Sequence, residues 1–148
     1  MNKIGIICKA GRPEPLEILR EFLPWLKGRG MEVFLEAETA NALGTPGHPR
    51  AEIPSLSEMV VVLGGDGTML SAARLVCEKG IPLLGVNLGG LGFITEVYRD
   101  ELYSAMEKIL VGSCPSEDRM MLRVEITRDK GKVAAYTALN DVVINKGA

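Results

Sequence analysis

Short apolar runs alternate with amphipathic stretches along the first 112 residues of the chain. Four of these runs have the length of strands, and the one at 59–63 is apolar on both faces, as in a buried parallel sheet. They lie at residues 4–8, 31–35, 59–63 and 81–86. The alternation predicts an α/β fold, a Rossmann-like open parallel sheet flanked by helices.

Three stretches carry apolar residues at helical spacing and are predicted to be helices. The first runs from Leu16 to Leu26 and contains Pro24, which is expected to kink or split it. The second follows the run at 59–63 and shows Met69, Ala72, Ala73 and Val76 on one face. The third is marked by Leu102, Met106, Ile109 and Leu110.

Residues 36–58 have almost no periodicity and contain three prolines and two glycines. A stretch of this length without structure is usually a functional flap or a disordered loop, and we predict one of these here. It includes the single histidine, His48. A solvated loop position is favoured for His48 over a functional role.

The pattern changes after residue 112. Strand-like runs at 120–127 and 133–139 flank a polar stretch with a glycine, which predicts a β-hairpin. A third run begins at 141–145. We therefore predict a domain of residues 1–112 that carries the glycine turn described below, and a second region, 113–148, that begins an antiparallel β domain.

Composition and charge exclude several classes of protein. The chain has 148 residues, 47% of them hydrophobic and 24% charged, with a net charge of −2. This is a globular composition without the basic patch of a nucleic-acid-binding protein, and no apolar run approaches the ~18 residues of a membrane span. Three widely spaced cysteines predict a reducing, cytoplasmic location and no zinc site, with Cys8 and Cys77 buried as small hydrophobes.

The stretch VVVLGGDGTML, Val60–Leu70, places one carboxylate in a glycine turn directly after an apolar run. Neither a Walker motif nor GxGxxG is present. Gly64 and Gly65 allow a sharp turn and the close approach of a ligand, and Thr68 offers a hydroxyl. Asp66 is either a helix N-cap or a carboxylate that accepts a proton from a hydroxyl, or holds Mg²⁺, beside phosphates. Because a cap needs fewer glycines, the second interpretation is favoured.

A second glycine-rich segment, NLGGLGF at Asn87–Phe93, follows the next apolar run. Ligands of open α/β sheets bind at the carboxyl ends of the strands, so both segments are expected to face one crevice. Phe93 is either a core aromatic or a wall against a flat ligand. On its own, Asn140–Asp141 favours a turn or bulge between two apolar runs. Arg119 is either a surface charge, which is favoured, or a side chain that reaches a phosphate or carboxylate.

Three motifs, LGGDGT at 63–68, NLGGLGF at 87–93 and LND at 139–141, resemble the NAD kinases in order and spacing. GGDGT alone is shared with diacylglycerol and sphingosine kinases, whereas the other two motifs restrict the resemblance to NAD kinases. It implies phosphorylation of the adenosine 2′-hydroxyl of NAD, giving NADP, with ATP as donor and a divalent cation, Mg²⁺, as cofactor. NAD and ATP are then the partners, and a homo-oligomer, dimer or tetramer, is expected.

The resemblance also implies roles for individual residues. Asp66 is the catalytic base that hydrogen-bonds and deprotonates the hydroxyl. Phe93 borders the adenine pocket, and Asn140 and Asp141 hold NAD through polar contacts. The remaining binding residues are Gly64, Gly65, Gly67, Thr68 and Asn87.

NAD kinases continue past the third motif into a β-rich domain, whereas this sequence ends at Ala148. We therefore expect an N-terminal portion with little or no kinase activity by itself. Two alternatives stay open, a lipid kinase of the diacylglycerol kinase type and a non-catalytic nucleotide-binding module. The lipid kinase alternative gives no reason for the second glycine-rich segment or for Asn140–Asp141.

Overall fold

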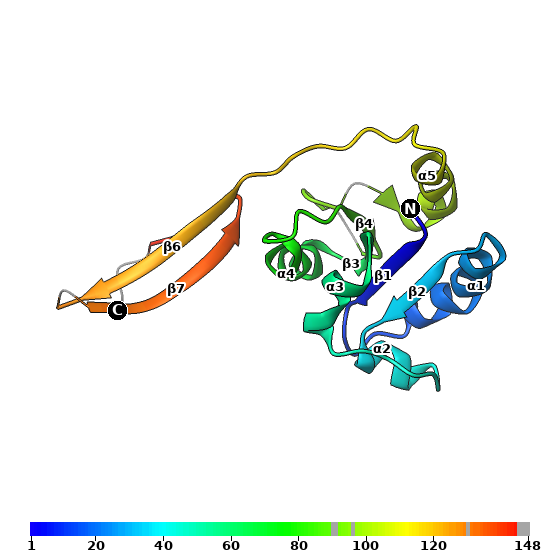
Figure 1. The fold of residues 1–148 in the computed structure, drawn as a ribbon, viewed down its shortest axis with the longest axis horizontal. Helices are drawn as coiled ribbons and strands as arrows, with labels where there is room; N and C mark the ends of the chain where they lie inside the picture. Colours follow the sequence, from blue (N-terminus) through cyan, green and yellow to red (C-terminus); the bar gives the residue numbers. More distant parts are fainter. Residues whose placement is uncertain (90–91, 96, 130, 145–148) are drawn as a thin grey trace. The chain divides into compact units, whose positions relative to one another are not determined.

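The computed structural model describes residues 1–148 except 90–91, 96, 130 and 145–148 (Figure 1). The chain divides into two compact units, Met1–Pro115 and Ser116–Ala148, and each is described by itself. The boundary predicted after residue 112 lies near this division. Within the described ranges, no helix is both long and apolar enough to cross a bilayer.

The first unit is built on a five-stranded parallel sheet of order β2-β1-β3-β4-β5. Its strands are β1 (Lys3–Cys8), β2 (Glu32–Leu35), β3 (Met59–Gly64), β4 (Leu83–Asn87) and β5 (Val97–Tyr98). The predicted α/β class is confirmed. The sequence pattern did not predict β5, because two residues are too short to show a periodicity.

Helices cover both faces of this sheet, as a buried parallel sheet requires (Figure 1). The helices α1 (Glu14–Gly28) and α5 (Leu102–Leu110) pack on one face, against Ile4 and Ile6 of β1. The helices α3 (Ile53–Leu56) and α4 (Asp66–Val76) pack on the other face, against Ile7 of β1. A 3-10 turn, η2 (Arg99–Glu101), leads into α5.

The first helix is continuous through Pro24, so the expected split is wrong. Pro24 is exposed, while Phe22 and Leu26 on the opposite face are fully buried. The carbonyl that loses its partner to the proline therefore lies on the solvent side, where water can satisfy it. Burial of the apolar face holds the two halves in one helix.

The segment 36–58 is structured, contrary to the prediction of an irregular loop. It forms α2 (Ala37–Ala42), the 3-10 turn η1 (Arg50–Glu52) and α3. His48 is half-buried rather than solvated, since it forms a β-bridge with Glu36 and its ring lies 5.5 Å from that of Phe34. The helices here are too short to show a hydrophobic period, which explains why sequence reasoning missed them.

The second unit contains an antiparallel pair, β6 (Met121–Arg128) and β7 (Gly131–Leu139), which confirms the predicted hairpin. The third run expected at 141–145 forms no strand over 141–144, and residue 145 lies outside the described residues. Asn140 ends β7 in a left-handed conformation, with φ of 71°. This conformation turns the chain out of the strand direction.

The packing of α3 against β1 leaves no room for a side chain at Gly5. A Cβ there would lie 2.5 Å from Cγ2 of Ile53 and 2.8 Å from Oγ of Ser57. We predict that Gly5→Ala lowers the free energy of unfolding by about 1–3 kcal/mol, because the helix must shift to relieve the overlap. Gly28→Ala is the matched control, since nothing lies near its Cβ position. Urea unfolding of both variants checks this, and equal stabilities would contradict the packing.

Candidate functional site

The two glycine-rich segments leave the sheet at the carboxyl ends of neighbouring strands. Gly64 of β3 is paired in register with Asn87 of β4. The Leu88 N–H continues this pairing beyond the strands and donates to the Gly64 carbonyl at 3.0 Å. The structure therefore brings the predicted residues of both segments together at one edge of the sheet.

Asp66 joins these two segments through its carboxylate. Its Oδ2 accepts the Phe93 N–H at 2.9 Å. Its Oδ1 accepts the N–H groups of Ile94 and Thr95, both at 3.2 Å, and the Thr95 hydroxyl at 3.1 Å. Gly65, not Asp66, is the N-cap of α4, and it makes no side-chain cap hydrogen bond. The N-cap interpretation of Asp66 is thus wrong, and the carboxylate holds the backbone of the second segment.

These hydrogen bonds stabilise the charged form of Asp66. The Phe93 N–H is the largest cause that lowers the pKa of this carboxyl below its usual value, and partial desolvation opposes it. The donors of Ile94 and Thr95 lower the pKa further. Asp66 is therefore ionised at neutral pH and is a weaker proton acceptor than an ordinary aspartate.

Two glycines of the motifs are required by packing. A Cβ at Gly64 would lie 2.5 Å from Oγ1 of Thr68, which belongs to the first turn of α4. A Cβ at Gly92 would lie 2.5 Å from Oγ1 of Thr95 and 3.0 Å from Oδ1 of Asp66. A larger residue at position 92 would separate the two segments, whereas a larger residue at position 64 would push away the first turn of α4.

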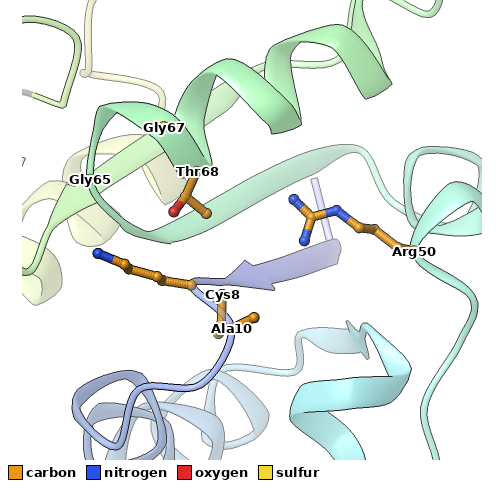
Figure 2. A pocket seen from close by; sticks show the side chains of 7 residues that line it. Cys8, Ala10, Arg50, Gly65, Gly67 and Thr68 are labelled. Atoms are coloured by element: carbon orange, nitrogen blue, oxygen red, sulfur yellow. The ribbon is translucent and has the colours of Figure 1, made fainter.

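Packing inside the protein does not require glycine at positions 65 and 67. Neither has a positive φ, and nothing lies within 4 Å of a Cβ at either position. Both glycines instead line a cavity of about 280 Å³ (Figure 2). Their effect is to leave this space empty of side chains, so that the backbone N–H groups at the start of α4 are accessible.

The cavity lies between the carboxyl ends of β1 and β3. In the strand order β2-β1-β3-β4-β5, the chain turns in opposite directions from β1 and from β3, so this is the topological switch point where open α/β sheets bind ligands. Besides the glycines, its walls are Cys8, Lys9, Ala10, Arg50 and Thr68.

Sequence reasoning missed the two cations of this cavity, Lys9 and Arg50. Neither belongs to a motif, and only the strand order brings the end of β1 next to the turn after β3. It also missed Thr95, a buried side chain bound to Asp66. Cys8 is not a nucleophile in this position, because burial raises the pKa of its thiol to about 12 and leaves it protonated.

The burial of the other residues singled out in the sequence can be compared with the predictions. Phe93 is 84% exposed, so the alternative of a core aromatic is wrong. Asn87 is buried and its Oδ1 accepts the Gly89 N–H at 2.9 Å, which shapes the start of the second segment. Gly90 and Leu91, within NLGGLGF, lie outside the described residues. Cys77 is half-buried, less than expected.

Asn140 and Asp141 belong to the second unit. The Asp141 N–H donates to the carbonyl of Leu139 at 3.0 Å, next to the left-handed Asn140, and this local geometry is that of a turn. Arg119 forms an ion pair with Glu117 at 2.9 Å. Across the part of the chain that the structure describes, no group of three or more His, Cys, Asp or Glu is placed to hold a metal ion.

Comparison with known proteins shows the family to which this chain belongs. The family model for the ATP-NAD kinase N-terminal domain matches residues 4–114. The NAD kinase of Syntrophotalea carbinolica is 47% identical over 100% of this chain and 53% of its own length. The NAD kinase of Geobacter metallireducens is 48% identical over 100% of this chain and 52% of its own length. The chain thus spans about half the length of the curated relatives it matches.

Two solved structures share the fold. Yeast NADH kinase, crystallised with NADH, has a TM-score of 0.80 at 19% identity, over 94% of this chain and 46% of the yeast chain. The NAD kinase of Archaeoglobus fulgidus, crystallised with ATP, has a TM-score of 0.55 at 19% identity, over 83% of this chain and 40% of its own. The match of the family model to most of the first unit shows that the chain belongs to the ATP-NAD kinase N-terminal domain family.

Proposed function

We propose that this chain forms the N-terminal part of an NAD kinase, which transfers the terminal phosphate of ATP to the adenosine 2′-hydroxyl of NAD and forms NADP. The proposal rests on one juxtaposition: Asp66 binds the backbone of the Phe93 segment, while its chain neighbours Gly65 and Gly67 line a cavity that also has cationic walls. Family membership supports it, as does the fold shared with kinases crystallised with NADH and with ATP.

The proposed reaction is a direct phosphoryl transfer. The 2′-oxygen of NAD forms a bond to the terminal phosphorus of ATP. The bond from that phosphorus to its bridging oxygen breaks, and the electron pair leaves with ADP. The hydroxyl proton passes to Asp66 and then to solvent. The protein's contribution is mainly positioning and charge stabilisation.

Asp66 is suited to orient the hydroxyl more than to remove its proton early. A carboxylate oxygen can accept about two hydrogen bonds, and Oδ1 already accepts three, from Ile94 and Thr95. Oδ2 accepts one, from Phe93, so we assign Oδ2 to the substrate hydroxyl. Because its pKa is lowered, Asp66 takes the proton late, when the new bond to phosphorus has made the hydroxyl acidic.

The remaining predicted residues receive binding roles. The backbone of Gly65 and Gly67 lines the cavity at the positive end of α4, and with the Thr68 hydroxyl it suits the ATP phosphates. We assign the exposed Phe93 to the adenine pocket of NAD. Gly64 and Asn87 are proposed to support binding indirectly, because they shape the backbone of the two segments. Asn140 and Asp141 stay proposed NAD ligands.

The residues present do not form a site for a divalent cation of their own. Among the described residues, no group of three or more His, Cys, Asp or Glu is placed to hold a metal ion, and Mg²⁺ in kinases takes much of its coordination from phosphates and water. We therefore propose that the Mg²⁺ of the reaction is bound by the phosphates of ATP, and we assign no residue of this chain as its ligand. A cytoplasmic location and a dimer or tetramer stay predictions from the cysteines and the resemblance.

The direct test is NADP formation by a chimera in which this chain replaces the aligned part of the Syntrophotalea carbinolica NAD kinase. We expect the chimera to form NADP from NAD and ATP, and Asp66→Asn to lower turnover by about 100-fold or more, because the amide cannot take the proton. A coupled NADP assay measures both.

Glu58→Gln is the matched control for this chimera. Glu58 also binds two backbone N–H groups, of Asn2 and Lys3, but belongs to neither glycine-rich segment. Its substitution should leave turnover unchanged. Full turnover in Asp66→Asn would remove the catalytic role, and NAD binding without turnover in the unsubstituted chimera would favour the non-catalytic module. Phosphorylation of diacylglycerol instead of NAD would favour the lipid kinase.

Gly67→Ala separates a ligand role from a folding role. We predict that it raises the free energy of unfolding by about 0.5 kcal/mol, since alanine favours the helix that contains residue 67. It should also weaken ATP binding by about tenfold, because its methyl group enters the cavity. Urea unfolding and calorimetric titration with ATP measure the two effects. Unchanged ATP affinity would mean that no ligand approaches this glycine.

The lowered pKa of Asp66 predicts a pH dependence of stability. A carboxyl with a lowered pKa in the folded chain stabilises it above its unfolded pKa of about 3.9, and this contribution is lost as the pH falls through the folded value. From pH 7 to pH 3, the wild type should therefore lose more stability than Asp66→Asn. Urea unfolding at several pH values tests this, and parallel pH profiles would contradict the role of its hydrogen bonds.

A further inference from the structure

A buried carboxylate that the proposed reaction does not use lies behind the switch-point cavity. Glu36 directly follows β2 and is 5% exposed. Its Oε1 accepts the Cys8 N–H at 2.7 Å and the Thr39 hydroxyl at 3.3 Å. Its Oε2 accepts Nη1 of Arg50 at 2.7 Å. A carboxylate is rarely buried unless it is paired, so Arg50 is the counter-charge that keeps Glu36 in this position.

Arg50 is held from two directions. Its Nη1 is bound to Glu36, and its Nη2 donates to the Ser71 hydroxyl on α4 at 3.2 Å. These bonds use two of the five N–H donors of a guanidinium. The Arg50 side chain is still 37% exposed, and it lines the cavity. In Figure 2 its guanidinium reaches into the space that Thr68 borders from another side.

The charges around this cavity favour an anion. Its lining residues, all in the described part of the chain, include Lys9 and Arg50 but no carboxylate. The backbone N–H groups at the start of α4 add partial positive charge. The planar fork of a guanidinium matches phosphate oxygens, provided that its orientation is fixed.

We propose that Arg50 binds a phosphate of the donor in the switch-point cavity, and that Glu36 is the positioning residue that holds its guanidinium there. This inference rests on the proposed function, and it extends that function to the segment 36–58, which carries no motif. The chemistry recognised is a phosphate chain, either of a nucleoside triphosphate or of an inorganic polyphosphate. The segment 36–58 is thereby a part of the donor site.

The experiment is a calorimetric titration of the 148-residue chain with ATP, with inorganic tripolyphosphate and with adenosine. The variants are Arg50→Ala, Arg50→Lys and Glu36→Gln. Arg74→Ala is the matched control, because Arg74 is an exposed arginine in the last turn of the same helix that carries Ser71. Urea unfolding of each variant separates loss of binding from loss of fold.

Arg50→Ala should weaken the binding of a phosphate chain by about tenfold or more, and Arg50→Lys should restore only part of it, since a lysine lacks the fork. Arg74→Ala should bind as the wild type does. Tripolyphosphate binding comparable to that of ATP assigns the site to the phosphate chain alone. Binding of ATP but not of tripolyphosphate makes the nucleotide necessary as well.

The sign of the effect of Glu36→Gln separates positioning from simple electrostatics. Removal of a nearby negative charge by itself would strengthen the binding of an anion. If Glu36 positions Arg50, the same substitution should weaken binding by several-fold, while the amide oxygen still accepts the Cys8 N–H. Stronger or unchanged binding in Glu36→Gln would remove its positioning role.

The inference and the proposed function fail separately. Wild-type affinity for both phosphate probes in Arg50→Ala overturns the inference, as does the absence of any binding of the two probes to the wild-type chain. The kinase proposal depends instead on NADP formation by the chimera. If the chimera is inactive but phosphate binding follows Arg50 and Glu36, the inference stands and the kinase proposal falls.

Discussion

The architecture of the first unit depends on the complete burial of β3. All six of its residues are buried, and it pairs with β1 on one side and β4 on the other. A strand covered on both faces can hold only apolar side chains, so polar chemistry is confined to the points where the chain leaves the sheet. The glycine turn with Asp66 follows β3 directly, and the Asn87 segment follows its neighbour.

At that edge, one carboxylate connects two loops that are far apart in the sequence. Asp66 binds the backbone of Phe93, Ile94 and Thr95, and Gly92 permits the close approach. The same hydrogen bonds lower the pKa of Asp66, so the interaction that orders the site also weakens the group as a base. The proposed mechanism follows from this balance: Asp66 orients the hydroxyl and receives its proton late.

The segment 36–58 connects the outer strand β2 to this edge. Its short helices pack against the sheet through residues such as Ile53, and Arg50 is fixed between Glu36 and Ser71. Because Glu36 is buried, Arg50 is its counter-charge, and the same ion pair fixes the orientation of the guanidinium. A segment without a recognisable motif can therefore carry a binding residue, which the strand order places beside the glycine turn.

The sequence alone was sufficient for every described strand except β5, for the longer helices and for the two glycine-rich motifs, because burial on two faces and helical periodicity leave local patterns. The prediction of the α/β fold rested mainly on apolar runs such as 4–8 and 59–63 and on the family resemblance. The sequence was not sufficient for the short helices of 36–58, for the continuity of α1 through Pro24 or for the partners of Asp66. These features depend on contacts between residues far apart in the chain, and only the tertiary structure decided them. Arg50 joined the candidate site for the same reason, since no local pattern records which strand ends meet at a switch point.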